Sequence, residues 1–347
     1  MTQLITGIQQ VGIGVRDCEE AKYLYKRTFG MDVLIFDDIA TAPLMTRYTG
    51  DELHERRAVL TMNLAGGGGF EMWQFLSRTP QACEPKFGDT GILAVKIKCR
   101  VVADTHSHYK DDVTLETSAM MNSPIGQPYF WTKDPYGNHF CIAESNSWFK
   151  KDTARTGGVC GAVIGVSRMD VSVPFYQNLL QLDQVLYDVT GPSFDIPNRC
   201  GDTFRRVLLK KKKSPNGAFT NLLGDIEIEL IQQVKDTPDR LFKNRYWGDC
   251  GFIHLCFDVI DMTALKKISQ QLGYHFTVDS KDSYAMDSAQ GRFCYVEDPD
   301  GTLIELVETH KIPVLKMLNW HIDLTKRKRG RPLPGWMIRM LGFSKVK

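Results

Sequence analysis

Residues 134–144 read Asp-Pro-Tyr-Gly-Asn-His-Phe-Cys-Ile-Ala-Glu, and residues 298–308 read Asp-Pro-Asp-Gly-Thr-Leu-Ile-Glu-Leu-Val-Glu. Each stretch is a turn signal followed at once by a short apolar strand, because Pro presets the first turn residue and Gly tolerates a positive φ at the end. The two copies lie 164 residues apart. This offset indicates that the two halves of the chain are related, and an internal repeat of this kind determines the fold.

The strands that open each repeat are also alike. Residues 10–17 read Gln-Val-Gly-Ile-Gly-Val-Arg-Asp, and residues 161–167 read Gly-Ala-Val-Ile-Gly-Val-Ser. Two further openings align with each other without a gap: residues 91–99 read Gly-Ile-Leu-Ala-Val-Lys-Ile-Lys-Cys, and residues 251–259 read Gly-Phe-Ile-His-Leu-Cys-Phe-Asp-Val. The chain therefore contains four strand openings of one type.

A helix is predicted after the openings. Asp17 and Asp261 are N-cap residues, and Gly30 and Gly273 end the periodic segments that follow them. The helix after the third opening carries Phe175-Tyr176 on its apolar face. The sequence thus predicts an α+β fold of four βαβββ units, which span roughly residues 5–77, 88–148, 157–235 and 248–310. We divide the chain into a first pair of units at 1–150, a second pair at 151–310 and a basic C-terminal tail at 311–347.

The composition is that of an ordinary globular protein. The 347 residues are 43% hydrophobic and 24% charged, which suits about two domains. The 9 cysteines are odd in number and include no Cys-x-x-Cys pair, so we expect free thiols in a reducing, cytoplasmic environment. No run of 18 apolar residues occurs, so no transmembrane segment is predicted.

Four such units, with the Asp-Pro-x-Gly turn before a last strand and Phe-Tyr in a first helix, resemble the vicinal-oxygen-chelate superfamily. Its members include glyoxalase I, extradiol dioxygenases and bleomycin-resistance proteins. The resemblance covers residues 5–310. It implies that units pair into two cupped mixed β-sheets. It also implies a divalent metal ion in a cup, held by side chains of the first and last strand of each unit.

The positions that the resemblance assigns to ligands differ between the units. The first and fourth units carry Gln10, Glu71, His254 and Glu305. The second and third units carry Ala94, Cys141, Gly161 and Glu229. Ala and Gly offer no donor atom, so only the first set predicts a metal site. One amide, one imidazole and two carboxylates resemble the ligands of glyoxalase I and suit Zn, Ni, Co, Mn or Fe. This set requires the first unit to pair with the fourth.

The resemblance also implies a reaction. A metal-dependent lyase, isomerase or epimerase would abstract a proton next to a carbonyl of a small-molecule substrate, with Glu305 as the base and Glu71 opposite it. We expect the loops at 37–57 and 188–204 to line the cups. One alternative is a non-catalytic binding protein of the resistance type. Another is an extradiol dioxygenase, in which the third and fourth units pair, although Gly161 stands where those enzymes have a histidine ligand.

A purely structural interpretation of the same residues also exists. Side chains alternate along a strand, so Glu71, Glu229 and Glu305 could each face solvent. His254 could be a buried polar residue with ordinary hydrogen-bond partners.

The tail is strongly basic. Residues 309–347 carry a net charge of +9, which leaves −7 on the rest of the chain. Arg329-Gly330-Arg331-Pro332 looks like an AT-hook core, but a single tetrapeptide in a chain without other nucleic-acid motifs does not predict DNA binding. We expect a basic strap on an acidic body. The apolar stretch at 333–343 is expected to form a short helix on that body or on a second subunit, which would make the protein a homodimer.

Overall fold

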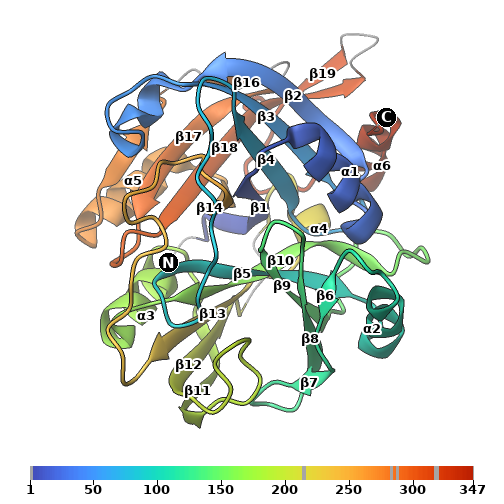
Figure 1. The fold of residues 1–347 in the computed structure, drawn as a ribbon. Coiled ribbons are helices and arrows are strands. Elements are labelled where there is room, and N and C mark those ends of the chain that lie inside the picture. Colours follow the sequence, from blue (N-terminus) through green and yellow to red (C-terminus); the bar gives the residue numbers. More distant parts are fainter. Residues whose placement is uncertain (1–2, 213–215, 282–283, 287–288, 316–319, 347) are drawn as a thin grey trace.

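The computed structural model describes residues 3–212, 216–281, 284–286, 289–315 and 320–346. Its strands form two curled mixed β-sheets, which lie one above the other in Figure 1 with the helices at their sides. This architecture confirms the predicted α+β class. No helix among the described residues is long and apolar enough to cross a membrane.

The first sheet combines the first and the fourth unit. β1 and β14 pair antiparallel at its centre, and each has a parallel neighbour, β4 and β18 respectively. In order across the sheet, its strands are β15 (Phe276–Asp279), β17 (Ala289–Glu297), β18 (Leu303–Leu315), β14 (Gly251–Val259), β1 (Ile5–Gly14), β4 (Gly69–Phe75), β3 (Glu55–Met62) and β2 (Val33–Thr41). β16 (Tyr284–Met286) pairs with β17, and β19 (Trp320–Asp323) pairs with β18.

The second sheet combines the third and the second unit in the same way. β10 and β5 pair antiparallel at its centre. In order across the sheet, its strands are β11 (Gln184–Pro192), β12 (Thr203–Lys210), β13 (Glu227–Gln233), β10 (Thr156–Gly165), β5 (Gly91–Cys99), β9 (His139–Glu144), β8 (Pro128–Lys133) and β6 (Glu116–Thr117), with β7 (Met121–Asn122) beside β8. The third and fourth units thus lie in different sheets, so the unit pairing of the dioxygenase alternative is not found.

The helices begin and end at the residues that the sequence marks. α1 (Cys18–Phe29) starts after Asp17, whose side chain accepts from two backbone N–H groups, and stops at Gly30 with a φ of 65°. α5 (Met262–Gln271) starts after Asp261 in the same manner. The remaining helices are α2 (Val102–Lys110), α3 (Met169–Asn178), α4 (Thr220–Leu223) and α6 (Gly335–Met340), with 3₁₀ turns at Pro43–Tyr48 and Leu341–Phe343.

The helix motif and the turn motif of the repeat are joined by hydrogen bonds. Tyr25 of α1 donates to Asp134 at 2.8 Å, and Tyr176 of α3 donates to Asp298 at 2.9 Å. Both acceptors are the first residue of an Asp-Pro-x-Gly turn and also accept from backbone N–H groups of that turn. Sheet pairing therefore connects units one and four, whereas these bonds connect unit one with two and unit three with four.

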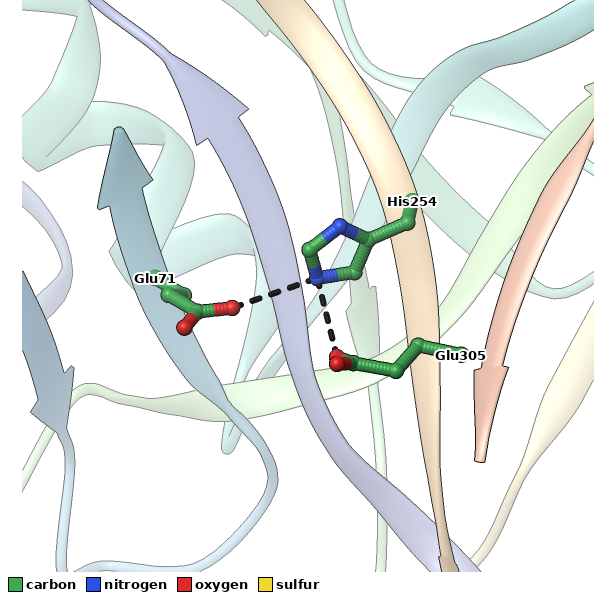
Figure 2. A group of neighbouring side chains, drawn as sticks. All are labelled: Glu71, His254 and Glu305. Carbon is green, nitrogen blue, oxygen red and sulfur yellow. Dashed lines mark ion pairs between the residues drawn. The ribbon is translucent and has the colours of Figure 1, made fainter. Parts of the chain in front are cut away.

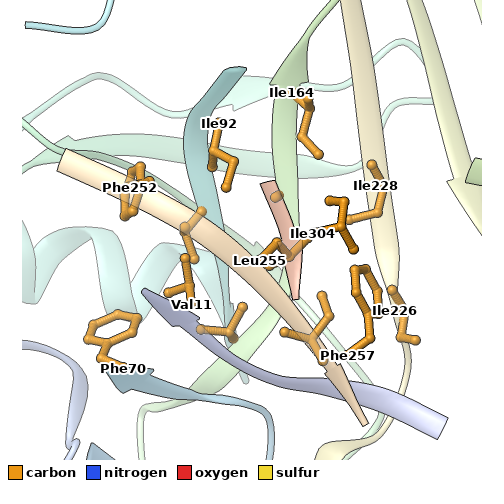
Figure 3. Close-up of a cluster of buried hydrophobic side chains, with 14 of the residues drawn as sticks. Val11, Phe70, Ile92, Ile164, Ile226, Ile228, Phe252, Leu255, Phe257 and Ile304 are labelled. Atoms are coloured by element: carbon orange, nitrogen blue, oxygen red, sulfur yellow. The ribbon is translucent and has the colours of Figure 1, made fainter. Parts of the chain in front are cut away.

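The main hydrophobic core lies between the two sheets. Val11, Phe70 and Leu255 of the first sheet meet Ile92 and Ile164 of the second, all at most 3% exposed (Figure 3). Side chains alternate along a strand, so their immediate neighbours point to the opposite, concave face of each sheet. The core thus places the positions next to Val11 and Leu255 inside the first cup.

The C-terminal tail packs on the first sheet. Ile338 of α6 and Leu333 are buried in a cluster with Val33 and Met62. Two ion pairs anchor the tail to acidic residues of the body: Arg329 with Asp261, and Lys345 with Asp32.

Candidate metal centre

Four neighbouring strands bring the predicted ligands together. Gln10 lies on β1, Glu71 on β4, His254 on β14 and Glu305 on β18. Gly12 stands between Glu71 and His254 in the register. A Cβ at Gly12 would lie only 2.4 Å from the imidazole, so the glycine leaves the space that the ring occupies.

The side chains converge on one point. The Nε2 atom of His254 lies 3.2 Å from Glu71 Oε2 and 3.1 Å from Glu305 Oε2, as Figure 2 shows. Gln10 Nε2 donates to Glu71 Oε2 at 3.1 Å. All four residues are at most 7% exposed, so both carboxylates and the imidazole face the inside of the cup rather than solvent.

The donor atoms fit a cation better than they fit one another. Gln10 Oε1, His254 Nε2 and Glu305 Oε2 are buried, and within the described residues none of them makes a regular hydrogen bond, although His254 Nε2 lies within ion-pair distance of both carboxylates. Buried polar atoms are rarely left unpaired, and three at one place point to a missing partner that accepts lone pairs. One ligand atom each from Glu71, His254 and Glu305 lies within 4.8 Å of the others, so this group could hold a metal ion.

The orientation of the imidazole supports this arrangement. Tyr295 of β17 shares a hydrogen bond of 3.3 Å with His254 Nδ1. A partner on one ring nitrogen sets the tautomer and turns the other nitrogen toward the ligand. Tyr295 therefore holds Nε2 toward the two carboxylates, a role that no local pattern of the sequence marks.

The electrostatics of the site also require a cation. Burial alone lowers the pKa of His254, but the carboxylates of Glu305 and Glu71 outweigh it and raise that pKa to about 9. Two buried carboxylates without a positive charge between them are costly in an apolar environment. The positive charge between the two carboxylates is therefore either a proton on His254 Nε2 or a metal ion that displaces this proton.

The second cup has a different interior. Glu229, at the position equivalent to Glu71, is buried and lies 2.7 Å from Arg206 and 3.5 Å from Lys96. Burial raises the pKa of Glu229, but the two cations prevail and lower it to about 2. Arg206 also pairs with Asp195 at 2.6 Å. Charged side chains of the protein itself thus fill this cup. The sequence feature that could have indicated this pairing is a charged residue at an inward position of an apolar strand.

The lining of the first cup differs from the expectation. Its pocket contains no residue of 37–57 and is lined instead by β2 and β3, by α4 and by Leu341 of the tail. Residues 189–195 do line a pocket, but beside Arg206 in the second cup. Met45 of 37–57 does pack with Phe36 and Leu60 in this sheet, but it does not reach the pocket beside the ligands. α4 and the tail reach that pocket from distant parts of the chain, which no local pattern reveals.

Comparisons with known proteins agree with this fold. Residues 160–306 match the model of the Glyoxalase/Bleomycin resistance protein/Dioxygenase superfamily. A glyoxalase I mutant from Zea mays superposes with a TM-score of 0.56 at 13% sequence identity, over 88% of this chain and 94% of that chain. A putative dioxygenase from Bacillus subtilis superposes with a TM-score of 0.56 at 15% identity, over 89% and 86%. No curated protein matches the chain.

The chain therefore has the vicinal-oxygen-chelate fold. Residues 160–306 match the superfamily model by sequence, and most of the chain superposes on glyoxalase I and on the putative dioxygenase. At such low identities the likeness extends to the fold alone.

Proposed function

We propose that this protein is a metal-dependent lyase, isomerase or epimerase that abstracts a proton next to a carbonyl of a small molecule. Its metal ion, one of Zn²⁺, Ni²⁺, Co²⁺, Mn²⁺ or Fe²⁺, is held by Gln10, Glu71, His254 and Glu305. The observation that carries the proposal is the convergence of Glu71, His254 and Glu305, whose ligand atoms lie buried within 4.8 Å of one another in the first cup; the described residues form no such group in the second cup. A divalent ion bound there supplies a Lewis acid for two adjacent substrate oxygens.

Glu305 is the candidate base of the two carboxylates. Gln10 Nε2 donates to Glu71 Oε2 at 3.1 Å and so holds that carboxylate in place. Glu305 has no such amide donor among the hydrogen bonds of the described residues, and it forms part of the wall of the adjoining pocket. Glu305 therefore takes the substrate proton, and Glu71 stands across the centre, where it can return one to the neighbouring carbon.

Ring cleavage of the extradiol type is less well supported. Ferrous oxygenases usually use two histidines and one carboxylate, and this centre offers one imidazole among oxygen donors. A binding protein without catalysis remains the second candidate, and metal content separates the two.

The experiment is elemental analysis of the purified full-length chain after removal of metal with a chelator and reloading. We expect one divalent ion per chain and, in His254→Ala, at least a hundredfold loss of affinity. The matched control is His139→Ala, which removes a buried histidine of the second sheet. Loss of the proton-abstracting group is then tested by solvent deuterium exchange into a panel of α-hydroxyketones, which Glu305→Gln should abolish.

Two results would contradict the proposal. If the reloaded protein holds no stoichiometric metal, the second candidate function, a binding protein without a metal ion, replaces the proposed enzyme. Metal that binds equally well to the His254→Ala variant would place the ion elsewhere.

A further inference from the structure

A largely apolar pocket, here called the chamber, adjoins the candidate metal centre. The cavity has a volume of about 140 Å³, and Gln10, Glu71 and Glu305 form one side of it. The opposite walls are apolar side chains, chiefly from β2 and β3, such as Phe36 and Leu60. A molecule bound at the centre through two oxygens therefore extends directly into this chamber.

Part of the chamber wall comes from outside the first and fourth units. Leu222 and Leu223 belong to α4 of the third unit, and Leu341 belongs to the tail. The tail is bound along β2, because Leu34 N–H donates to the carbonyl of Ser344 at 2.8 Å. It is also bound to the segment before α4, because Leu333 N–H donates to the carbonyl of Ala218 at 2.9 Å. These bonds hold Leu341 in place as a wall.

The charges of the lining restrict what can enter. The two acidic ligands are the only charged residues among the described residues that line the chamber. Its other polar groups are neutral, among them Gln9, Gln290 and Thr309. A ligand group with a negative charge would lose its hydration and find no cation in exchange, which is strongly unfavourable. A divalent ion would balance the two acidic ligands, so a cationic group gains nothing either.

We propose that the substrate joins two adjacent oxygen atoms to an uncharged, apolar body, and that Leu341 of the tail is a specificity-determining contact for that body. The proposal rests on the proposed function for the oxygen end only. The apolar end is recognised by the chamber itself, with or without metal.

The test uses two fluorescent probes that share one skeleton. N-phenyl-1-naphthylamine is uncharged, and 8-anilinonaphthalene-1-sulfonate carries a sulfonate on the same rings. We expect the full-length, chelator-treated protein to bind the neutral probe at one site, at least tenfold more tightly than the anionic one. Probe binding to stripped protein tests the chamber, and metal uptake tests the centre, so the two proposals fail separately.

Variants of the tail locate the probe. Leu341→Glu places a charge in the wall and should weaken the neutral probe at least tenfold, and Leu341→Ala should weaken it severalfold without a charge. The control is Phe343→Glu in the same 3₁₀ turn, because Phe343 is 75% exposed and does not line the chamber. Equal affinity for both probes would overturn the proposed selectivity. Unchanged binding in both Leu341 variants would overturn the role of the tail.

Discussion

At the scale of single residues, two equivalent positions distinguish the cup with the candidate metal centre from the other cup. The register pairs place Ala58 opposite Trp73 in the first sheet and Arg206 opposite Ile231 in the second. They likewise place Cys256 opposite Gln10 and Lys96 opposite Gly161. The second cup thus gains two cations at positions where the first has small neutral side chains. Arg206 and Lys96 balance the negative charge of Glu229, as a metal ion would balance that of Glu71.

This contrast gives a prediction for two equivalent glutamates. Glu229→Gln leaves Arg206 and Lys96 buried with too little negative charge, so we expect a loss of about 3 kcal/mol in the free energy of unfolding. Glu71→Gln should instead weaken metal binding and change the stability of the metal-free protein little. Urea denaturation and metal titration of both variants test this. A Glu229→Gln protein as stable as the wild type would contradict it.

A second residue-scale prediction concerns pH. Asp258 on β14 is buried, and burial raises its pKa to about 7 although Thr6 and Gln9 donate hydrogen bonds to it. The folded protein therefore keeps a proton on Asp258 that the unfolded chain releases near pH 4. Because the folded state binds more protons between about pH 4 and 7, this group makes the protein less stable as the pH rises through that range.

Asp258→Asn removes this titration. We expect the difference in unfolding free energy between variant and wild type to shift in favour of the variant from pH 5 to pH 8, as measured by urea denaturation at both values. A difference that does not change with pH would show that Asp258 does not titrate in this range.

At the scale of elements, the sequence predicted those parts of the fold that depend on local signals. Asp17 and Gly30 mark α1 because caps act on neighbouring backbone, and the two Asp-Pro-x-Gly turns are defined by their own residues. The position of α4 against the first cup was not predictable, since that helix reaches it from the third unit. Tyr295 was missed for the same reason: its role exists only through contact with His254.

The bonds between helices and turns give a prediction at this scale. Tyr25→Phe and Tyr176→Phe each remove a hydroxyl donor from a buried turn aspartate, although Asp134 keeps Asn138 Nδ2 as a second side-chain donor. We therefore expect each to lower the free energy of unfolding by about 1.5 kcal/mol. The two sites share no partner, so the double variant should lose the sum. Tyr23→Phe on the exposed side of α1 is the control and should change nothing measurable. Thermal or urea unfolding provides the measurement, and a neutral Tyr176→Phe would contradict the role of this bond.

At the scale of the whole molecule, the sequence left open which units pair. All four units carry the same local pattern. Their turns and helices would therefore fit a pairing of unit one with four and two with three as well as a pairing of one with two and three with four. The uneven distribution of donor residues favoured the pairing of unit one with unit four, and the sheet order has this pairing. The division of the chain into two pairs of units at residue 150 stays a prediction. It does not coincide with the two sheets, because each sheet contains one unit from before residue 150 and one from after it.

This pairing predicts how the protein responds to being cut. The segment near Asp152 and Thr153 is exposed and joins the halves. Residues 1–152 would carry Gln10 and Glu71 without His254 and Glu305, and both central strand pairs, β1 with β14 and β5 with β10, would be broken. We expect neither fragment, produced alone, to give a cooperative unfolding transition or to bind metal. Mixing them should restore both properties, as circular dichroism and metal titration would show. A fragment that folds and binds metal by itself at the affinity of the intact chain would contradict a centre shared between the two halves.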